Sequence, residues 1–185
     1  MSETSTIPLL ILRAQRGNRE ATARLYELYH DEIYRFLAYR TGDADSAADL
    51  TGDVFLKMVE ALPHYRSNGA PFRAWLYQIA RNLAIDHYRR GKSHPQENLS
   101  EQHQASAQSP EEAVQSHHQI RDLYLALQRL PEDQRDVLVL RFLNGLPLAE
   151  VARILHRSED AIKGLQRRGL MALREELKLL EVPNV

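Results

Sequence analysis

The chain has 185 residues, 43% hydrophobic and 26% charged, a composition typical of folded globular proteins rather than disordered ones. It contains no cysteine, which excludes disulfide frameworks, cysteine nucleophiles and thiolate metal sites. Lysine and arginine number 24 against 25 aspartate and glutamate, and the formal net charge of −1 argues against binding nucleic acid by bulk positive charge.

The opening apolar run, Ile7 to Leu12, is interrupted by Pro8 and is too short for a signal-peptide core or a membrane span. No later apolar stretch approaches the ~18 residues that a membrane helix needs. We therefore expect no membrane insertion and a cytoplasmic location.

Charge and composition divide the sequence into three parts. Residues 96–118 contain no lysine or arginine, four glutamates and almost no apolar pattern, whereas both flanking parts are slightly basic. Such a segment cannot bury enough surface to fold on its own. We predict two small domains, residues 1–92 and 120–185, joined by a flexible linker over residues 93–119.

Three helices are predicted in the first domain. Apolar residues recur at steps of three and four over residues 25–37, and Gly42 closes the run. The same spacing covers residues 47–62, where Pro63 ends it, and a turn-rich segment then precedes a helix over residues 72–90. Strand-like alternation is absent from the sequence, so the predicted fold class is all-α.

The second domain is predicted to be helical as well. A helix begins after Pro131 and ends at Asn144-Gly145, and it is followed by helices over residues 148–155 and 159–180. The last two have the spacing of a helix-turn-helix. The break between them requires one residue with positive φ, a role that falls to His156, and Ser158 is the expected N-cap of the final helix.

Six basic residues against two acidic ones lie between Arg153 and Arg174. Lys163 and Arg167 share one helix face with Arg168 beside them, which favours DNA binding by the final helix. The alternative is a solvated basic face on an ordinary helical hairpin. Gly164 and Gly169 inside this helix each cost about 1 kcal/mol relative to alanine, although Gly164 would allow a close approach to DNA.

Aromatic and basic residues interleave over residues 72–90, the pattern of a surface that binds single-stranded nucleic acid. The other interpretation is that the aromatics form a core, and we expect Trp75 to be structural. Asn82, Arg89 and Arg90 are the better candidates for contacts, because they lie at polar positions near the charged end of the helix.

Asp43, Asp45, Asp49 and Asp53 mark the start of the second helix, as acidic residues often do. A metal site is disfavoured because neither histidine nor further acid lies at ligand spacing, and a protein-docking face fits better. There is no HExxH sequence, phosphate-binding glycine loop or nucleophile elbow. We therefore expect no metal, no cofactor and no enzymatic activity.

Three segments in this order resemble the extracytoplasmic-function (ECF) group of bacterial sigma-70 factors: DADSAADLTGDVFLKMVEALPHY, APFRAWLYQIARNLAIDHYRR and LQRLPEDQRDVLVLRFLNGLPLAEVARILHRSEDAIKGLQRRGLMALREEL. The resemblance covers residues 24–92 and 120–177. It implies a promoter-specificity subunit of RNA polymerase.

The resemblance also implies roles for matched positions. Polymerase contacts are implied for Asp49, Leu50, Asp53, Val54 and Phe55. Capture of the −10 promoter element, where a base is extruded from the duplex, is implied for Arg66, Ser67, Asn68, Phe72, Asn82, Asp86, Arg89 and Arg90. Contacts to the −35 element in the major groove are implied for Arg157, Ser158, Lys163, Gly164, Arg167 and Arg168.

The implied partners are core RNA polymerase, through its β′ clamp and β subunit, and promoter DNA, with an anti-sigma factor as a further candidate. The alternative function is an autonomous helix-turn-helix regulator that binds a symmetric operator without polymerase. The near-neutral net charge favours the sigma factor, because polymerase would supply most of the electrostatic attraction to DNA.

Overall fold

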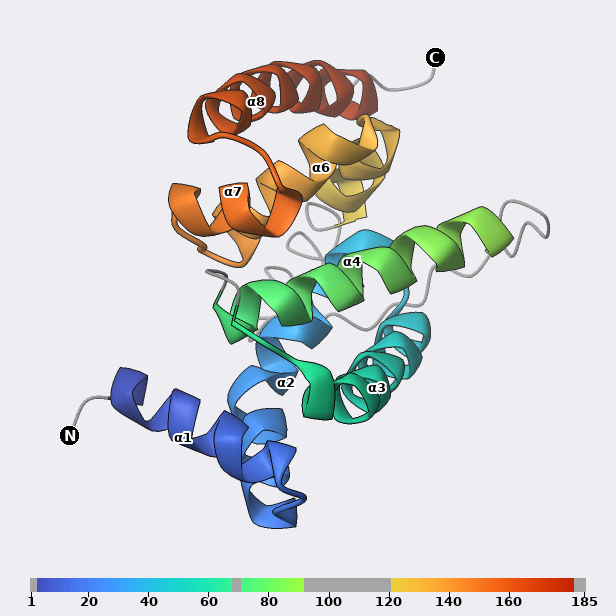
Figure 1. The fold of residues 1–185 in the computed structure, drawn as a ribbon. Helices are drawn as coiled ribbons and strands as arrows, with labels where there is room; N and C mark the ends of the chain where they lie inside the picture. The colour runs from blue at the N-terminus through green and yellow to red at the C-terminus, as the bar shows by residue number, and fades with distance from the viewer. Residues whose placement is uncertain (1–2, 68–70, 92–120, 182–185) are drawn as a thin grey trace, which may run out of the picture. The chain divides into compact units, whose positions relative to one another are not determined.

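The computed structural model describes residues 3–67, 71–91 and 121–181. Within these ranges every regular element is a helix, so the all-α prediction is confirmed (Figure 1). The described residues form two compact units, one within residues 1–97 and the other within 98–185, with residues 42–44 grouped with the second. The predicted linker over 93–119 lies outside the described residues, and the domain boundaries stay a prediction.

The described helices of the first unit are α1 (Glu3–Gln15), α2 (Arg19–Thr41), α3 (Ala44–Ala61), the short 3-10 helix η1 (Leu62–His64) and α4 (Phe72–Gly91) (Figure 1). Helix α1 was not expected, because Pro8 lies inside it and a proline removes one helical hydrogen bond. The packing of α1 on α2 and η1 offsets that loss, which no local sequence pattern reveals.

The core of the first unit is formed by the apolar faces of α2, α3 and α4. Its largest fully buried side chains are Leu25, Ile33, Phe36, Leu37, Met58, Leu76 and Tyr77. Phe36 meets Tyr77 edge to face with 5.5 Å between the ring centroids. Each such side chain stabilises the unit by roughly 1.5–3 kcal/mol relative to its exposed state, so the core fixes which faces of α3 and α4 remain outside.

Helices α1 and α2 are joined by a tight junction at Gly17 and Asn18. Gly17 has a φ of +82°, and its N–H donates to the carbonyl of Ala14 at 2.9 Å, while the Asn18 N–H donates to Arg13 at 3.1 Å. This is the Schellman arrangement that ends a helix. The Asn18 Oδ1 then accepts the Ala21 N–H at 2.8 Å and caps α2.

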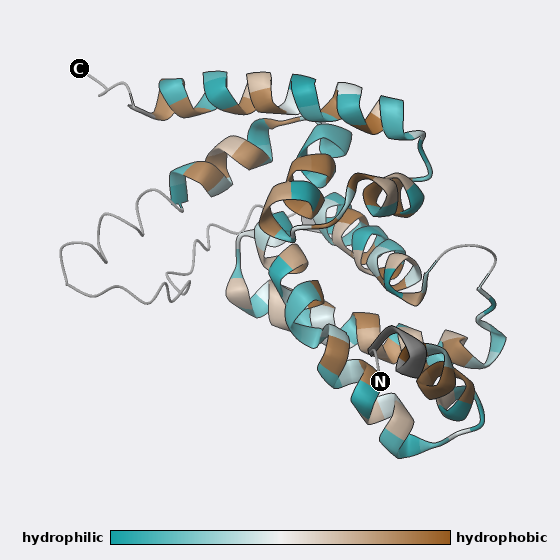
Figure 2. Cartoon of the chain, turned by 90° about the vertical axis from the view of Figure 1, so that its left-hand side faces the viewer, coloured by the Kyte–Doolittle hydropathy of each residue, from teal (hydrophilic) through white to brown (hydrophobic). Residues whose placement is uncertain are grey.

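In the second unit residues 121–129 are helical. They are followed by α6 (Glu132–Leu138), the π-helical turn η2 (Val139–Leu143), α7 (Leu148–Leu155) and α8 (Glu159–Glu181). In η2 the Asn144 N–H donates to the carbonyl five residues earlier, at Val139, at 2.9 Å, which is the wider turn of a π-helix. Teal and brown bands alternate along α8, because apolar residues recur at helical spacing (Figure 2).

The predicted helix-turn-helix is confirmed in its geometry. Helix α7 ends at His156, whose φ of 52° and ψ of 45° place it in the left-handed region, and the Arg157 N–H donates to the Ala152 carbonyl at 2.9 Å. The Ser158 Oγ accepts the Ala161 N–H at 3.2 Å and caps α8 as expected. Turn and cap together fix the direction in which α8 leaves α7.

The two glycines inside α8 differ in their surroundings, and this predicts different effects on stability. A Cβ at Gly169 would lie 3.2 Å from the Leu138 Cγ on α6, whereas a Cβ at Gly164 would meet only the Arg168 guanidinium, at 3.4 Å. We expect Gly164→Ala to raise the free energy of unfolding by about 1 kcal/mol. Gly169→Ala gains the same helix propensity, but its Cβ crowds the Leu138 side chain, which must shift to make room. We therefore expect the free energy of unfolding of Gly169→Ala to lie about 1 kcal/mol or more below that of Gly164→Ala. Chemical denaturation followed by circular dichroism measures both, and equal values for the two variants would contradict the close packing at Gly169.

Candidate nucleic-acid interface

The exposed face of α8 carries most of the residues predicted to contact the −35 element. Lys163, Arg167 and Arg168 are exposed, and Gly164 lies half-buried beside the Arg168 guanidinium. The opposite face buries Ile162 and Leu165 against the core. The first three turns of α8 therefore combine one anchored face with one basic face, as a helix that enters the major groove requires.

The cations of this region are not equivalent. Arg157 forms an ion pair with Asp133 of α6, and Lys163 pairs with Asp160 one turn earlier at 3.0 Å. The hydrogen bond to Asp160 and its charge raise the pKa of Lys163. In the part of the chain that the structure describes, Arg167 and Arg168 have no ion-pair partner, so their guanidinium groups are more available to an anionic ligand than the paired Arg157 and Lys163.

Arg141, at the π-helical turn, braces the helix-turn-helix from within. Its Nη1 donates to the Leu146 carbonyl, just before α7, and its Nε donates to the Gln166 Oε1 of α8 at 3.4 Å. One half-buried side chain thus links η2 to the loop that leads into α7 and to α8. Sequence reasoning placed Arg141 only within a helix, because no local pattern marks a bond that spans 25 residues.

The second half of α4 presents its predicted residues together. Asn82, Asp86, Arg89 and Arg90 are all exposed, and steps of four, three and one place them on one side of the helix. The Arg90 Nε donates to the Asp86 carbonyl at 3.3 Å. Helix α4 is itself held on α2 by Arg73, whose Nε lies 2.9 and 3.0 Å from the two Glu32 carboxylate oxygens.

The segment before α4 places its predicted residues differently. Arg66 and Ser67 are exposed, and Asn68 lies outside the described residues. Phe72 is buried, with ring centroids 5.4 Å from Tyr65 and 5.3 Å from Trp75, so it supports the segment from below instead of offering a surface to DNA. Along α4, residues 72 and 82 are about 15 Å apart.

Tyr65 is the centre of this aromatic cluster. Its ring lies 4.7 Å from that of Trp75. Burial raises the pKa of Tyr65, and a hydrogen bond with Ser67 acts in the opposite direction. Trp75 packs half-buried among these rings, in line with the structural role expected for it.

Helix α3 divides its predicted polymerase contacts between two faces. Asp49 and Asp53 are exposed, whereas Leu50, Val54 and Phe55 are buried. Phe55 packs edge to face on Tyr26 of α2, with 4.7 Å between the centroids. The three apolar residues therefore hold α3 in place, and the surface that a partner can reach narrows to the aspartate side.

Two exposed apolar residues on α3, Leu56 and Val59, are not among the polymerase contacts predicted from the sequence. Leu56 is 59% exposed and Val59 is 48% exposed, and Leu56 follows Asp49 and Asp53 on one helix face. The sequence could have revealed them, because they are apolar yet lie off the stripe formed by the buried residues Ala47, Leu50, Val54 and Met58. Exposed apolar residues beside carboxylates are typical of a protein-docking surface.

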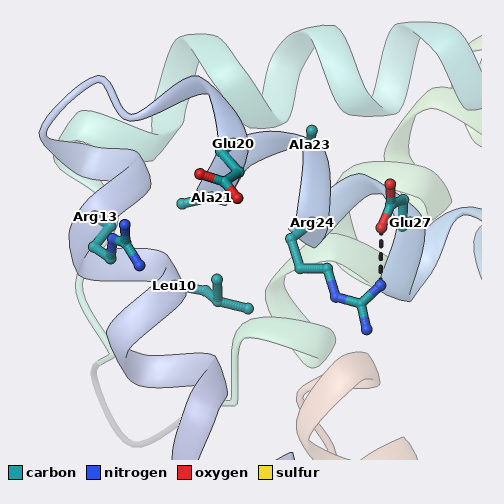
Figure 3. Close-up of a pocket in the computed structure, with 7 residues that line it drawn as sticks. All are labelled: Leu10, Arg13, Glu20, Ala21, Ala23, Arg24 and Glu27. Atoms are coloured by element: carbon teal, nitrogen blue, oxygen red, sulfur yellow. Dashed lines mark hydrogen bonds and ion pairs between the residues drawn. The ribbon is translucent and has the colours of Figure 1, made fainter.

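The first unit also has a pocket between α1 and α2. Figure 3 shows Arg13, Glu20, Arg24 and Glu27 around its rim, with Arg24 and Glu27 paired at 2.8 Å. Two arginines and two glutamates cancel in charge, so this pocket does not attract nucleic acid.

Neither a metal site nor a membrane-spanning helix is found in residues 3–67, 71–91 and 121–181. Among these residues no three histidine, aspartate or glutamate side chains gather into a metal site. None of the described helices combines the length and hydropathy needed to cross a bilayer.

The geometry defines a helical protein with a helix-turn-helix and a second polar helix face, and comparisons with known proteins agree. Residues 25–94 match the family "Sigma-70 region 2", and residues 126–175 match "Sigma-70, region 4". The chain belongs to the ECF group of the sigma-70 family.

Individual relatives give the extent of the similarity. The chain is similar to the ECF RNA polymerase sigma factor BldN of Streptomyces coelicolor, with 37% identity over 93% of this chain and 66% of BldN. It is also similar to SigX of Bacillus subtilis, with 32% identity over 84% of this chain and 83% of SigX. A solved structure of the sigma factor RpoE in complex with the anti-sigma factor NepR from Bartonella quintana aligns with a TM-score of 0.66 and 25% identity, over 84% of this chain and 96% of that one.

Proposed function

We propose that this chain is a promoter-specificity subunit that joins core RNA polymerase and directs it to promoters through three surfaces. The observation that carries the proposal is that all three surfaces lie on the segments that match sigma-70 regions 2 and 4. The subunit has no catalysis of its own, and it acts in the cytoplasm where polymerase and DNA meet.

The polymerase-docking surface is the exposed side of α3. Asp49 and Asp53 supply carboxylates to basic groups on the β′ clamp, and Leu56 supplies an apolar contact about one turn beyond Asp53 on the same face. Leu50, Val54 and Phe55 act indirectly, because they fix α3 in the core. This pairing of a buried stripe with an acidic and apolar outer face supports a preformed docking helix.

The −10 surface consists of the segment before α4 and the outer face of α4. Arg66, Ser67 and Asn68 contact the extruded base, and Phe72 supports this surface indirectly by packing on the Tyr65 ring. Asn82, Asp86, Arg89 and Arg90 bind the adjoining strand, with amide and carboxylate groups for base edges and guanidinium groups for phosphates. Opening the duplex costs a few kcal/mol of unstacking, and these contacts offset that cost.

The −35 surface is the first half of α8. Arg167 and Arg168 are the principal contacts, since they have no ion-pair partner in the described part of the chain. Arg157 and Lys163 must exchange Asp133 and Asp160 for phosphate, so their contribution is smaller. Gly164 lets the backbone approach the groove, and Ser158 fixes the start of the helix.

An anti-sigma factor is a further proposed partner, because RpoE, which this chain resembles in fold, is seen bound to the anti-sigma factor NepR. On the second unit, Phe142, Leu170 and Met171 are exposed apolar residues. Leu170 and Met171 follow Arg167 by three and four residues, so they extend the basic face of α8 with an apolar contact for a partner, the β subunit among them.

Run-off transcription tests the whole proposal. Purified chain and core polymerase, incubated with a library of promoter fragments from the native genome, are expected to yield transcripts that neither component yields alone. Core polymerase alone is the control. An absence of transcripts across the library, together with tight binding of a symmetric operator by the chain alone, would replace the sigma factor by the autonomous regulator.

A substitution on the docking surface is expected to weaken polymerase binding without changing the stability of the chain. Asp53→Ala removes an exposed carboxylate without disturbing Val54 beside it, so we expect the affinity for core polymerase to fall roughly three- to tenfold while the free energy of unfolding is unchanged. Fluorescence anisotropy of labelled chain titrated with core polymerase measures the affinity. The matched control is Glu20→Gln, an exposed carboxylate on α2, and an equal loss in that variant would indicate a general charge effect.

Arg168 tests how α8 reads DNA. If its guanidinium binds a base edge, Arg168→Ala weakens promoter binding by the holoenzyme roughly 5- to 150-fold and relaxes the preference at one −35 position. Binding to a panel of promoters with single −35 changes measures both quantities. Arg174→Ala, an exposed arginine further along the same helix, is the control. A uniform loss across the panel would make Arg168 a phosphate contact.

A further inference from the structure

The side chain of Gln15, the last residue of α1, connects this helix to the 3-10 turn η1. Its side-chain amide Nε2 donates to the Leu62 carbonyl at 3.1 Å and to the Tyr65 carbonyl at 2.8 Å. Both acceptors belong to the 3-10 turn η1 and its C-terminal cap. A single amide group thus holds the two ends of the turn, using the two hydrogens that it can donate.

The turn held by Gln15 is where the chain leaves α3 for the proposed −10 surface. The Tyr65 N–H donates to the Leu62 carbonyl at 3.1 Å, and Tyr65 itself has an extended backbone with φ −60° and ψ 130°. Arg66 and Ser67 follow immediately. The hydrogen bond from Gln15 to the Tyr65 carbonyl therefore helps to fix the direction of the backbone that leads into Arg66 and Ser67.

The position of Gln15 is fixed by α1 and by its terminal turn. Ala14 is buried, and the Gly17 N–H donates to the Ala14 carbonyl at 2.9 Å, so the last turn of α1 is closed. The match to sigma-70 region 2 begins at residue 25, so α1 lies outside the segment to which that match gives a role.

We propose that Gln15 is a positioning residue for the −10 surface, which makes α1 part of the promoter-opening apparatus. The inference rests on the proposed function of Arg66 and Ser67. Gln15 does not touch DNA; it holds the Tyr65 backbone, and the Tyr65 ring in turn packs on Trp75 and Phe72 at the start of α4. Without the amide, the turn gains freedom that binding of the −10 strand must remove again.

The first test needs no DNA. Trp75 is the only tryptophan of the chain and lies 4.7 Å from the Tyr65 ring, so its emission reports on the anchored cluster. Gln15→Met keeps the length of the side chain and removes both donors. We expect a shifted emission maximum in Gln15→Met and an unchanged one in Arg16→Gln, the exposed neighbour. Identical spectra for Gln15→Met and the unaltered chain would overturn the anchoring.

The second test separates positioning from stability. Holoenzyme made with each variant is titrated with the labelled non-template strand of the −10 region from a promoter found by run-off transcription. We expect strand binding about tenfold weaker for Gln15→Met, the loss of two hydrogen bonds being shared between folding and binding, with polymerase affinity within twofold of the unaltered chain. Unchanged strand binding, or an equal fall in strand and polymerase binding, would overturn the proposal.

Two controls complete the design. If Gln15→Met does not fold, as judged by circular dichroism, Gln15→Asn keeps the amide but shortens its reach, and the same two outcomes decide. If holoenzyme with the unaltered chain fails to bind the strand, the proposed −10 surface is wrong, whereas a changed Trp75 emission would still place Gln15 as the anchor of the turn.

Discussion

Helix α3 carries Val54 in the core next to Asp53 on the surface, and α8 carries Ile162 in the core next to Lys163. Adjacent residues on a helix differ by ~100° in direction, so each exposed group is placed by the buried neighbour that pins the helix. The proposed contacts on α3, α4 and α8 depend on this division of each helix into two faces. A surface charge on these helices can therefore change with little effect on folding, while a change of the buried neighbour moves every contact on that helix.

The same division explains how a chain with a net charge of −1 offers cationic surfaces. Positive charge gathers on the outer faces of α4 and α8, and around the start of α8 it is partly neutralised, because Asp133 pairs with Arg157 and Asp160 pairs with Lys163. Such local neutralisation weakens non-specific attraction to phosphates, which depends on the number of free cations. A specificity subunit benefits from this, since its own attraction to random DNA would compete with the choice of site.

Local chemistry made most of the fold predictable. The helix-turn-helix was expected at residues 148–155 and 159–180 because its signals, a break at His156 and a cap at Ser158, act within a few residues of one another. Helix α1 was missed, because Pro8 argues against it locally and its support comes from packing. The bridges of Gln15 and Arg141 span many residues of sequence, so no periodicity could reveal them. For the site, the sequence predicted which helices matter, but the burial of Phe55 and Phe72 emerges only when helices meet.

The π-helical turn at Val139–Leu143 sets the directions of the last side chains of the helix that begins at Glu132, before the chain leaves that helix at Asn144. An extra residue in a turn offsets the next segment by ~100° relative to an uninterrupted α-helix. That offset accompanies an outward-facing Phe142 and a buried Leu146, and Arg141 there reaches both Leu146 and Gln166. Deleting one residue from this turn would restore regular α-helical winding and rotate Arg141 away from both partners. The wide turn thus places Arg141 where it connects α8, the helix proposed to read DNA, to the loop before α7.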